Sequence, residues 1–165
     1  MGEYRMEKLV LILGLFIIIA AFSADQLSKI AADMYVADSH GLAIFDWFNL
    51  IKVWNTGVSF SMFNDYGNIG KYLLIILALI VCAFLLYLML KEKNKLKITA
   101  LGLIIGGALG NVIDRIRFGA VFDFLDFHYQ TYHWPAFNLA DTFICIGAGL
   151  LIMMEVLNSK KKGIN

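Results

Sequence analysis

Four long apolar stretches limit what this chain can fold into more than any other feature of its sequence. They predict membrane-spanning segments at residues 9–26, 70–90, 98–114 and 138–157. A helix needs about 20 apolar residues to cross a hydrocarbon core about 30 Å thick, and the second stretch meets this need most clearly. Only 16% of the 165 residues are charged, against about 25% in a soluble domain. We therefore predict one integral-membrane domain, residues 1–165, built as an all-α bundle of four transmembrane helices.

The first apolar stretch has an alternative interpretation. Arg5 and Lys8 precede an apolar run that continues to Ala21-Phe22-Ser23, and this order of features is typical of a secretory signal peptide. Three further apolar stretches follow, so a retained first helix fits the sequence better.

Lysine and arginine residues predict how the helices are oriented. They precede the first stretch, fill the link between the second and third, and follow the fourth. These residues are Arg5, Lys8, Lys91, Lys93, Lys95, Lys97, Lys160, Lys161 and Lys162. Positive residues concentrate on the cytoplasmic side of a membrane, so we expect both termini to be cytoplasmic. Residues 27–69 and 115–137 would then face outward.

Both outward segments are rich in aromatic residues. Between Leu42 and Phe63, aromatic and β-branched residues favour short strands, which predicts a small sheet on the outer membrane surface. An aromatic belt without a sheet would give the same composition, so that alternative stays open. For the second segment, from Phe118 to Phe137, we predict a half-inserted loop or a short helix.

Glycines recur at every fourth position of the third stretch. Gly102, Gly106 and Gly110, with Gly107 beside them, form a doubled small-xxx-small pattern that allows a neighbouring helix to approach closely. The stretch is too apolar for a nucleotide-binding loop, so we predict a structural role for these glycines.

Polar residues beside the apolar stretches need a physical reason, because charge is costly near lipid. Asp25 and Lys29 lie four residues apart, a spacing that favours a helical ion pair. We predict that they fix the outer end of the first helix and its neighbours. Asn55-Thr56-Gly57 suits a tight turn.

Three polar residues, Asn111, Asp114 and Arg115, end the third stretch together. Because Asn111 and Arg115 are four residues apart, both can face the same site. A cluster of side chains that extend to the membrane interface is the alternative interpretation.

Two aspartates stand in strongly apolar surroundings. Asp141 is followed by a long apolar run, and Asp123 lies in Val-Phe-Asp-Phe-Leu-Asp-Phe. Two carboxylates brought together would not both ionise easily, so one would hold a proton. Such a pair can activate water and protonate a leaving nitrogen. Asp126 is an alternative partner for Asp141, and a proton or ion pathway would use similar residues.

Several other chemistries find no support in the sequence. It has no HExxH zinc motif and no Ser–His or Cys–His pair placed for catalysis within the membrane. We expect His40, His128 and His133 to lie at the membrane interface. The net charge of +1 gives no reason to expect a nucleic-acid partner.

Taken in order, these motifs resemble those of bacterial lipoprotein signal peptidase, also called signal peptidase II. The matching stretches are Asp25-Gln26-Leu27-Ser28-Lys29, Asn55-Thr56-Gly57, Gly106 to Asn111 with Asp114-Arg115, Val121-Phe122-Asp123-Phe124, and Phe137-Asn138-Leu139-Ala140-Asp141. Each stretch alone is weak, but the ordered set is specific and covers nearly the whole chain.

The resemblance implies four transmembrane helices with a small extracytoplasmic β-cradle in the bacterial inner membrane. It implies a monomeric aspartyl endopeptidase without metal or cofactor. Its substrates would be prolipoproteins bearing a diacylglyceryl-modified cysteine, cut just before that cysteine. Globomycin inhibits the family, so binding of globomycin-type inhibitors is implied as well.

The resemblance also assigns residues. Asp123 and Asp141 match the family's catalytic pair. Positions that match the lining of its substrate or inhibitor site are Asn55, Gly57, Asn111, Arg115 and Asn138. Asp25, Lys29 and Asp114 match positions at the margin of that site.

One departure follows the second motif, where Val58 and Ser59 stand in place of the small residues of many relatives. We expect this to alter loop packing and not activity. Two other function classes fit the residues less well. One is a small ion- or proton-conducting protein, and the other is a non-catalytic membrane subunit held by the glycine face.

Overall fold

The computed structural model describes residues 2–36, 41–57 and 69–162. Its helices are α1 (Gly2–Tyr35), α2 (Ile69–Lys91), α3 (Lys95–Phe118) and α4 (Leu139–Lys162). Its strands are β1 (Leu42–Phe45), β2 (Phe48–Asn55), β3 (Val121–Tyr129) and β4 (Tyr132–His133). The fold class is confirmed: four helices are long and apolar enough to cross a membrane, and a small sheet accompanies them.

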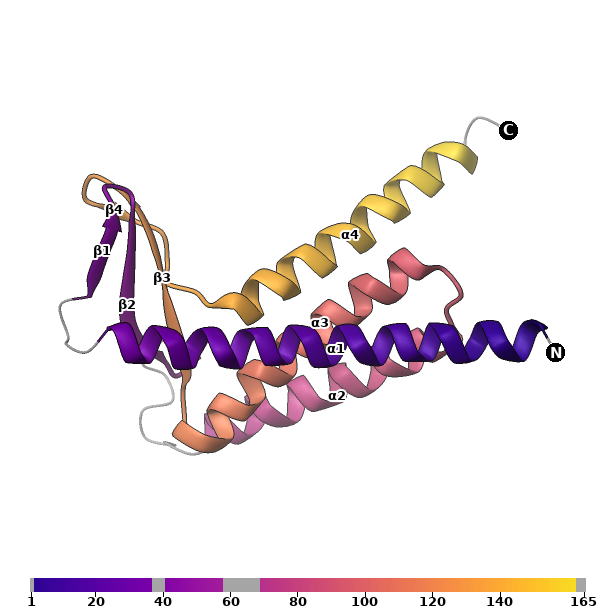
Figure 1. The fold of residues 1–165 in the computed structure, drawn as a ribbon, viewed down its shortest axis with the longest axis horizontal. Helices are drawn as coiled ribbons and strands as arrows, with labels where there is room; N and C mark the ends of the chain where they lie inside the picture. The colour runs from indigo at the N-terminus through magenta and orange to yellow at the C-terminus, as the bar shows by residue number, and fades with distance from the viewer. Residues whose placement is uncertain (1, 37–40, 58–68, 163–165) are drawn as a thin grey trace.

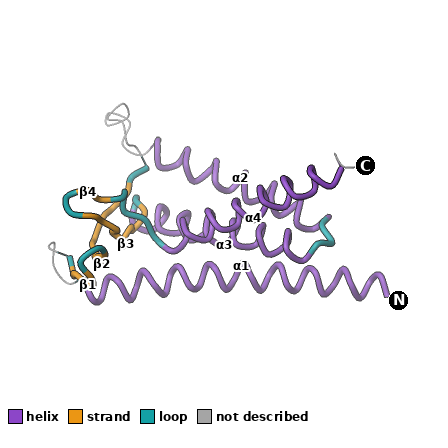
Figure 2. Tube along the Cα trace, turned by 90° about the horizontal axis from the view of Figure 1, so that it is seen from above, coloured by secondary structure: helices purple, strands orange, loops and turns teal. Residues whose placement is uncertain are grey.

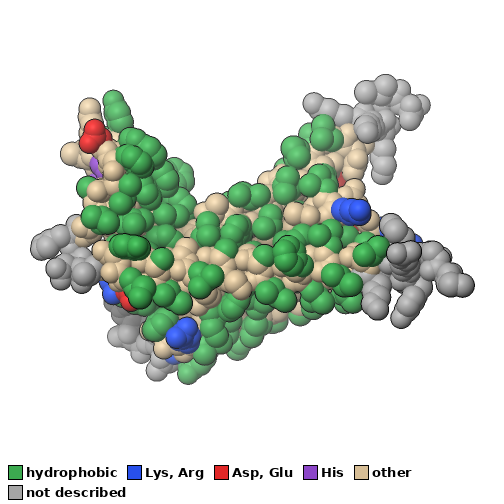
Figure 3. Space-filling view, viewed as in Figure 1, with side chains coloured by type: hydrophobic (Ala, Val, Ile, Leu, Met, Phe, Trp, Pro, Cys, Tyr) green, Lys and Arg blue, Asp and Glu red, His purple; other side chains and the backbone are tan. Residues whose placement is uncertain are grey.

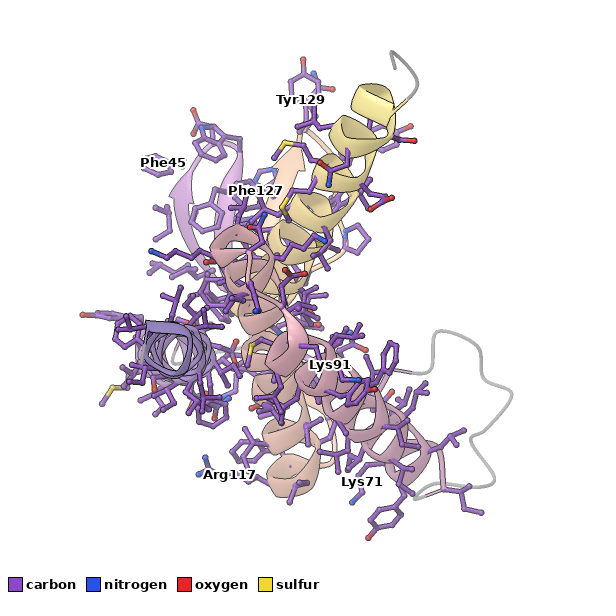
Figure 4. All side chains as sticks on the ribbon, turned by 90° about the vertical axis from the view of Figure 1, so that its right-hand side faces the viewer. Phe45, Lys71, Lys91, Arg117, Phe127 and Tyr129 are labelled. Carbon is purple, nitrogen blue, oxygen red and sulfur yellow. The ribbon has the colours of Figure 1, made fainter. Side chains whose placement is uncertain are left out.

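Helix α3 is the centre of the bundle. It contacts α1, α2 and α4, and these three helices surround it when the molecule is viewed nearly along α1 (Figure 4). Half of the residues in its most apolar 18-residue stretch are buried inside the protein, against 17% in the corresponding stretch of each other helix. The other three helices therefore expose most of their apolar surface, as lipid-facing helices do.

The glycines of α3 account for this close packing. A Cβ at Gly106 would lie 2.6 Å from the Ile18 carbonyl oxygen of α1, and a Cβ at Gly107 would lie 2.5 Å from the Ala140 carbonyl oxygen of α4. Because glycine has no side chain, both backbones can approach α3 at these points. The predicted structural role of the glycine pattern is confirmed.

The four strands form one antiparallel meander in the order β1-β2-β3-β4, at one end of the helices (Figure 1). Both chain termini lie at the opposite end (Figure 1). The sheet is fastened to the bundle by a core of Ala32 from α1 with Phe122 and Phe124 from β3. Lys52 of β2 also pairs with Asp33 of α1. The predicted sheet is confirmed.

Two other expectations were wrong. Residues 118–137 form neither a half-inserted loop nor a short helix, because Val121–Tyr129 pairs along β2 as a strand. Asp25 and Lys29 do not mark the end of the first helix, since α1 continues to Tyr35. In the view of Figure 2, this long helix runs along one side of the bundle to the edge of the sheet.

The junction between α3 and β3 is tight. Gly119 has a left-handed φ of 81°, and its N–H bonds to the Arg115 carbonyl oxygen. Glycine adopts this conformation without strain and ends the helix there. The chain therefore passes directly from the polar end of α3 into the strand that carries Asp123.

Candidate active site

The N-terminus of α4 is capped by two reciprocal hydrogen bonds between Asn138 and Asp141. The Asp141 N–H donates to the Asn138 side-chain oxygen at 3.0 Å, and the Asn138 N–H donates to the Asp141 carboxylate at 3.2 Å. This is the geometry of a capping box, with Asn138 as the cap. Asp141 is thereby held at the positive end of the α4 dipole, where a carboxylate is favoured.

Asp123 projects from β3 and is held by two neutral amides. The Asn55 amide of β2 donates to one carboxylate oxygen at 2.9 Å, and the Asn138 amide donates to the other at 2.7 Å. The Asp123 side chain is almost fully buried. No cation among the residues that the structure describes forms an ion pair with it.

Asn111 of α3 completes the link between the two aspartates. Its amide nitrogen donates to Asp141 at 2.8 Å, and its oxygen accepts from the Asn138 amide at 3.1 Å. Asn138 therefore bonds to Asp123, Asn111 and Asp141 at once. The structure brings Asp123 and Asp141 into one hydrogen-bonded site at the junction of α3, α4 and the sheet.

The surroundings of Asp123 favour its protonated form. The pKa of this carboxyl is raised to about 6: burial is the largest cause, the negative charge of Asp141 adds to it, and the Asn55 and Asn138 amides and the Lys29 charge oppose the rise. A carboxyl with a pKa near neutrality can both accept and release a proton.

Arg115 and Gly57 lie next to this group of polar side chains. The Arg115 guanidinium is half-buried and experiences the charges of Asp141 and Asp123. Within the described ranges, its Nε has no hydrogen-bond partner. Gly57 has a left-handed φ of 77°, and a Cβ there would lie 3.2 Å from the Arg115 guanidinium. The Gly57 N–H bonds to the Asn55 side chain at 2.8 Å, which turns the chain beside the guanidinium.

Asp25, Lys29 and Asp114 form a second cluster behind Asn111. The Lys29 ammonium lies 2.9 Å from Asp25 and 2.7 Å from Asp114, so the predicted helical ion pair is present. Asp25 also accepts from the Ala140 N–H at 2.9 Å. Asp25 and Lys29 therefore contact neighbouring elements, as predicted. These contacts join α1 to α3 and α4.

Asp126, the alternative partner of Asp141, belongs to another cluster. It is three residues from Asp123 on β3, and alternation along a strand places the two side chains on opposite faces. Asp126 accepts from Asn49 at 2.9 Å and contacts His133 at 2.8 Å. Burial alone would raise its pKa, but the His133 and Asn49 contacts outweigh burial and lower it.

Three residues of these clusters were not predicted from the sequence. Asn49 and His133 hold Asp126, and only the register of the strands reveals their proximity. Gln26 donates to both Asp25 and Asp114 at 3.1 Å, and its position beside Asp25 was the available indication. His40, Val58 and Ser59 lie outside the described residues. Within the described part of the chain, no cluster of histidine, cysteine and acidic residues could hold a metal ion.

Comparison with known proteins identifies the family. A sequence model described as Signal peptidase (SPase) II matches residues 17–157. The chain belongs to the signal peptidase II family. It is therefore a peptidase, and neither an ion-conducting protein nor a non-catalytic subunit accounts for this match.

Curated relatives of this signal peptidase II chain support the assignment over most of its length. It is 39% identical to the lipoprotein signal peptidase of Anaplasma phagocytophilum, over 88% of this chain and 92% of that protein. It is 41% identical to the lipoprotein signal peptidase of Aeromonas hydrophila, over 91% of this chain and 92% of that protein.

A solved structure shares the fold of this signal peptidase II chain. It is described as a bacterial membrane enzyme structure obtained by the in meso method, and the alignment covers 90% of each chain. The TM-score is 0.77 at 25% sequence identity. Four membrane-capable helices and this family together describe a multi-pass bacterial membrane protein.

Proposed function

We propose that this peptidase removes the signal peptide from prolipoproteins that carry a diacylglyceryl-modified cysteine, cutting just before that cysteine. We further propose that it is an aspartyl endopeptidase with Asp123 and Asp141 as its catalytic pair. The observation that carries the proposal is the shared Asn138, which hydrogen-bonds to both carboxylates. Two relatives named lipoprotein signal peptidase support the substrate class.

The mechanism follows from the unequal surroundings of the two carboxyls. Asp141 accepts two hydrogen bonds, from Asn111 and from the backbone of Asn138, at the α4 N-terminus. Asp123 is buried and forms no ion pair with any cation among the described residues, and burial raises its pKa to about 6. The pair would share one proton. The charged carboxylate would take a proton from water, and the protonated carboxyl would give one to the leaving nitrogen.

The shape of the protein supports a lipid-anchored substrate. Figure 3 shows a hollow between the sheet and α4, and hydrophobic side chains gather on its walls. Asp141 is half-buried, so water and a peptide can reach one member of the pair. Lipid chains could stay in the bilayer while the peptide lies against the sheet, because the site lies where the helices end.

Orientation and inhibition belong to the same proposal. The distribution of lysine and arginine supports cytoplasmic termini, which would place the sheet and the site at the outer face of the inner membrane. The protein would act as a monomer surrounded by lipid. Globomycin-type inhibitors would occupy the site between the sheet and the helices.

The direct test is cleavage of a lipidated prolipoprotein by the purified full-length enzyme. The proposal predicts one product whose N-terminus is the lipidated cysteine, identified by mass spectrometry. A precursor with that cysteine replaced by serine should remain uncut. Globomycin should stop cleavage, and a chelator should leave it unchanged because two carboxyls need no metal. A cut elsewhere, or equal cleavage of the serine precursor, would refute the substrate assignment.

A further inference from the structure

The cluster behind the site contains a lysine whose three donors are all used. Lys29 is almost fully buried, at 5% exposure. Its ammonium donates to Asp25 at 2.9 Å and to Asn111 at 3.2 Å, and it lies 2.7 Å from Asp114. An ammonium has three N–H groups, so each one has its own oxygen. Among these three partners, Asn111 is the one whose side chain itself donates to Asp141.

That bond determines which way the Asn111 amide faces. The Asn111 oxygen faces the Lys29 ammonium, and its nitrogen donates to Asp141 at 2.8 Å. In the reversed orientation, the amide nitrogen would face a cation and the amide oxygen would face a carboxylate. Both contacts would then be repulsive, so the Lys29 charge excludes the orientation that fails to hold Asp141.

Asn138 cannot replace Lys29 in this role. The Asn138 amide nitrogen has two hydrogens, but three acceptors lie within reach: Asp123 at 2.7 Å, Asn111 at 3.1 Å and the Phe122 carbonyl at 3.4 Å. The Asn111 oxygen therefore competes with Asp123 for this donor. Lys29 is the donor to Asn111 that does not draw a hydrogen bond away from the pair.

We propose that Lys29 is a positioning residue for the catalytic pair: its ammonium fixes the Asn111 amide, and that amide holds Asp141 in its reactive position. The inference rests on the proposed function, since it assumes that Asp123 and Asp141 do the chemistry. It extends the machinery to a residue that is buried behind Asn111.

The position of Lys29 also affects protonation at the site. Burial raises the pKa of Asp123 to about 6, and Lys29 is among the groups that oppose this rise. The charged groups that act on Asp123 are Asp141 from α4, Lys29 from α1 and Arg115 from α3. Removing the Lys29 cation leaves the raising effects less opposed, so the alkaline limb of the pH–rate profile, where Asp123 loses the proton that it gives to the leaving nitrogen, should move to higher pH.

The first test replaces Lys29 by an apolar side chain of similar length in the full-length enzyme. In Lys29→Met, kcat for a lipidated prolipoprotein should fall about 10²-fold, as expected when a reactive group is misplaced. KM should stay within about threefold of wild type, because a buried lysine does not meet substrate. A raised KM with an unchanged kcat and an unchanged pH profile would overturn the inference.

The second test separates positioning from stability, because Lys29→Met leaves two buried carboxylates without their cation. Lys29→Met/Asp114→Asn carries one carboxylate and no cation, so its net charge equals that of the wild-type cluster. Its unfolding temperature should recover most of the loss, while kcat stays low because Asn111 still lacks its donor. Recovery of kcat together with stability would mean that Lys29 is only structural.

Gln26→Met provides a matched control. Gln26 donates to the same two carboxylates as Lys29, at 3.1 Å each, and no hydrogen bond joins its side chain to Asn111 in the described structure. Its kcat and pH profile should stay within about threefold of wild type. A fall as large as that of Lys29→Met would show that any damage to the cluster slows cleavage, and would overturn the inference.

Asp141→Asn, measured in parallel, separates this inference from the proposed function. If Asp141→Asn cleaves normally, the proposed function fails. If Asp141→Asn is inactive while Lys29→Met keeps its kcat and pH profile, only the role of Lys29 fails.

Discussion

Two groups of carboxylates lie next to each other in this protein, and they differ in what holds them. Asp25 and Asp114 share the Lys29 ammonium. Asp123 and Asp141 are held by the amides of Asn55, Asn111 and Asn138. We call the first group the cation-held pair and the second the amide-held pair.

The difference explains why only one of these pairs suits proton transfer. A cation next to a buried carboxylate compensates its charge. A neutral amide stabilises a carboxylate by hydrogen bonding but does not cancel its charge. Two carboxylates held only in this way gain from sharing a proton. The cation-held pair therefore fastens helices together, and the amide-held pair is left free to exchange protons.

The largest effect that we expect is a loss of stability when the cation-held pair loses its cation. Lys29→Met should lower the free energy of unfolding by about 3–5 kcal/mol, because both buried carboxylates lose their partner. Thermal unfolding in detergent at neutral pH measures the loss. An unchanged unfolding temperature would mean that the cation does not stabilise the first pair.

Removing a charge from the amide-held pair should stabilise the protein, whereas Lys29→Met should destabilise it. Since the pKa of Asp123 is raised from 3.8 to about 6, the native state retains a proton between these values that the unfolded chain has released. The stabilising contribution of this group is therefore full below about pH 4 and is lost as pH rises through 6. Above pH 6, Asp123→Asn should be more stable than wild type, by up to about 3 kcal/mol.

Unfolding temperatures of wild type and Asp123→Asn between pH 4 and 8 test whether the variant is the more stable protein. The difference in unfolding temperature should grow between about pH 4 and pH 6 and stay constant above pH 6. A constant difference between the two proteins would show that Asp123 keeps an ordinary pKa.

A smaller effect is expected from one amide of the site. Asn55→Ala removes a donor to Asp123 and should lower kcat about tenfold, which equals about 1.4 kcal/mol of barrier. The alkaline limb of the pH–rate profile should move to higher pH, because the Asn55 hydrogen bond lowers the pKa of Asp123 and Asp123 must be protonated to act as the acid.

Asn49→Ala is the matched control for that experiment. Asn49 also lies on β2 and donates to a β3 aspartate at 2.9 Å, but that aspartate is Asp126. Its kcat should stay within about threefold of wild type. Equal losses in Asn49→Ala and Asn55→Ala would mean that the whole sheet, and not the amide at Asp123, governs the rate.

The smallest expected effect concerns Asp126, which shares its strand with Asp123 but is stabilised as an anion by His133 and Asn49. Asp126→Asn should cost about 1 kcal/mol of stability at neutral pH, the usual net value of a lost hydrogen bond. Cleavage should continue at nearly the wild-type rate in the prolipoprotein assay. A large loss of activity would bring Asp126 back as a partner of Asp141.

The sequence predicted the helices better than the strands, for a physical reason. Long apolar stretches mark membrane helices by local composition alone. Strand β3 depends on pairing with β2, which is distant in the sequence: Val53 lies opposite Asp123, and Asn49 lies opposite Asp126. Its phenylalanines and aspartates therefore suggested a loop at the membrane edge.

The candidate site was predicted residue by residue from motifs, but its connections were not. The helical spacing of Asp25 and Lys29 indicated their contact. The bonds from Asn138 to Asp123 and from Lys29 to Asn111 join separate elements. Only the packing of α1, α3 and α4 around the α3 glycines brings these groups within hydrogen-bonding distance.

The most direct measurement is cleavage of a lipidated prolipoprotein by Asp123→Asn, Asp141→Asn and Asp126→Asn, each purified and shown to be folded. Asparagine keeps the shape of each side chain but removes its ability to carry a proton between water and the leaving nitrogen. The account predicts at least about 10³-fold slower cleavage for the first two variants and near wild-type cleavage for the third. Wild-type turnover by folded Asp123→Asn or Asp141→Asn would contradict it.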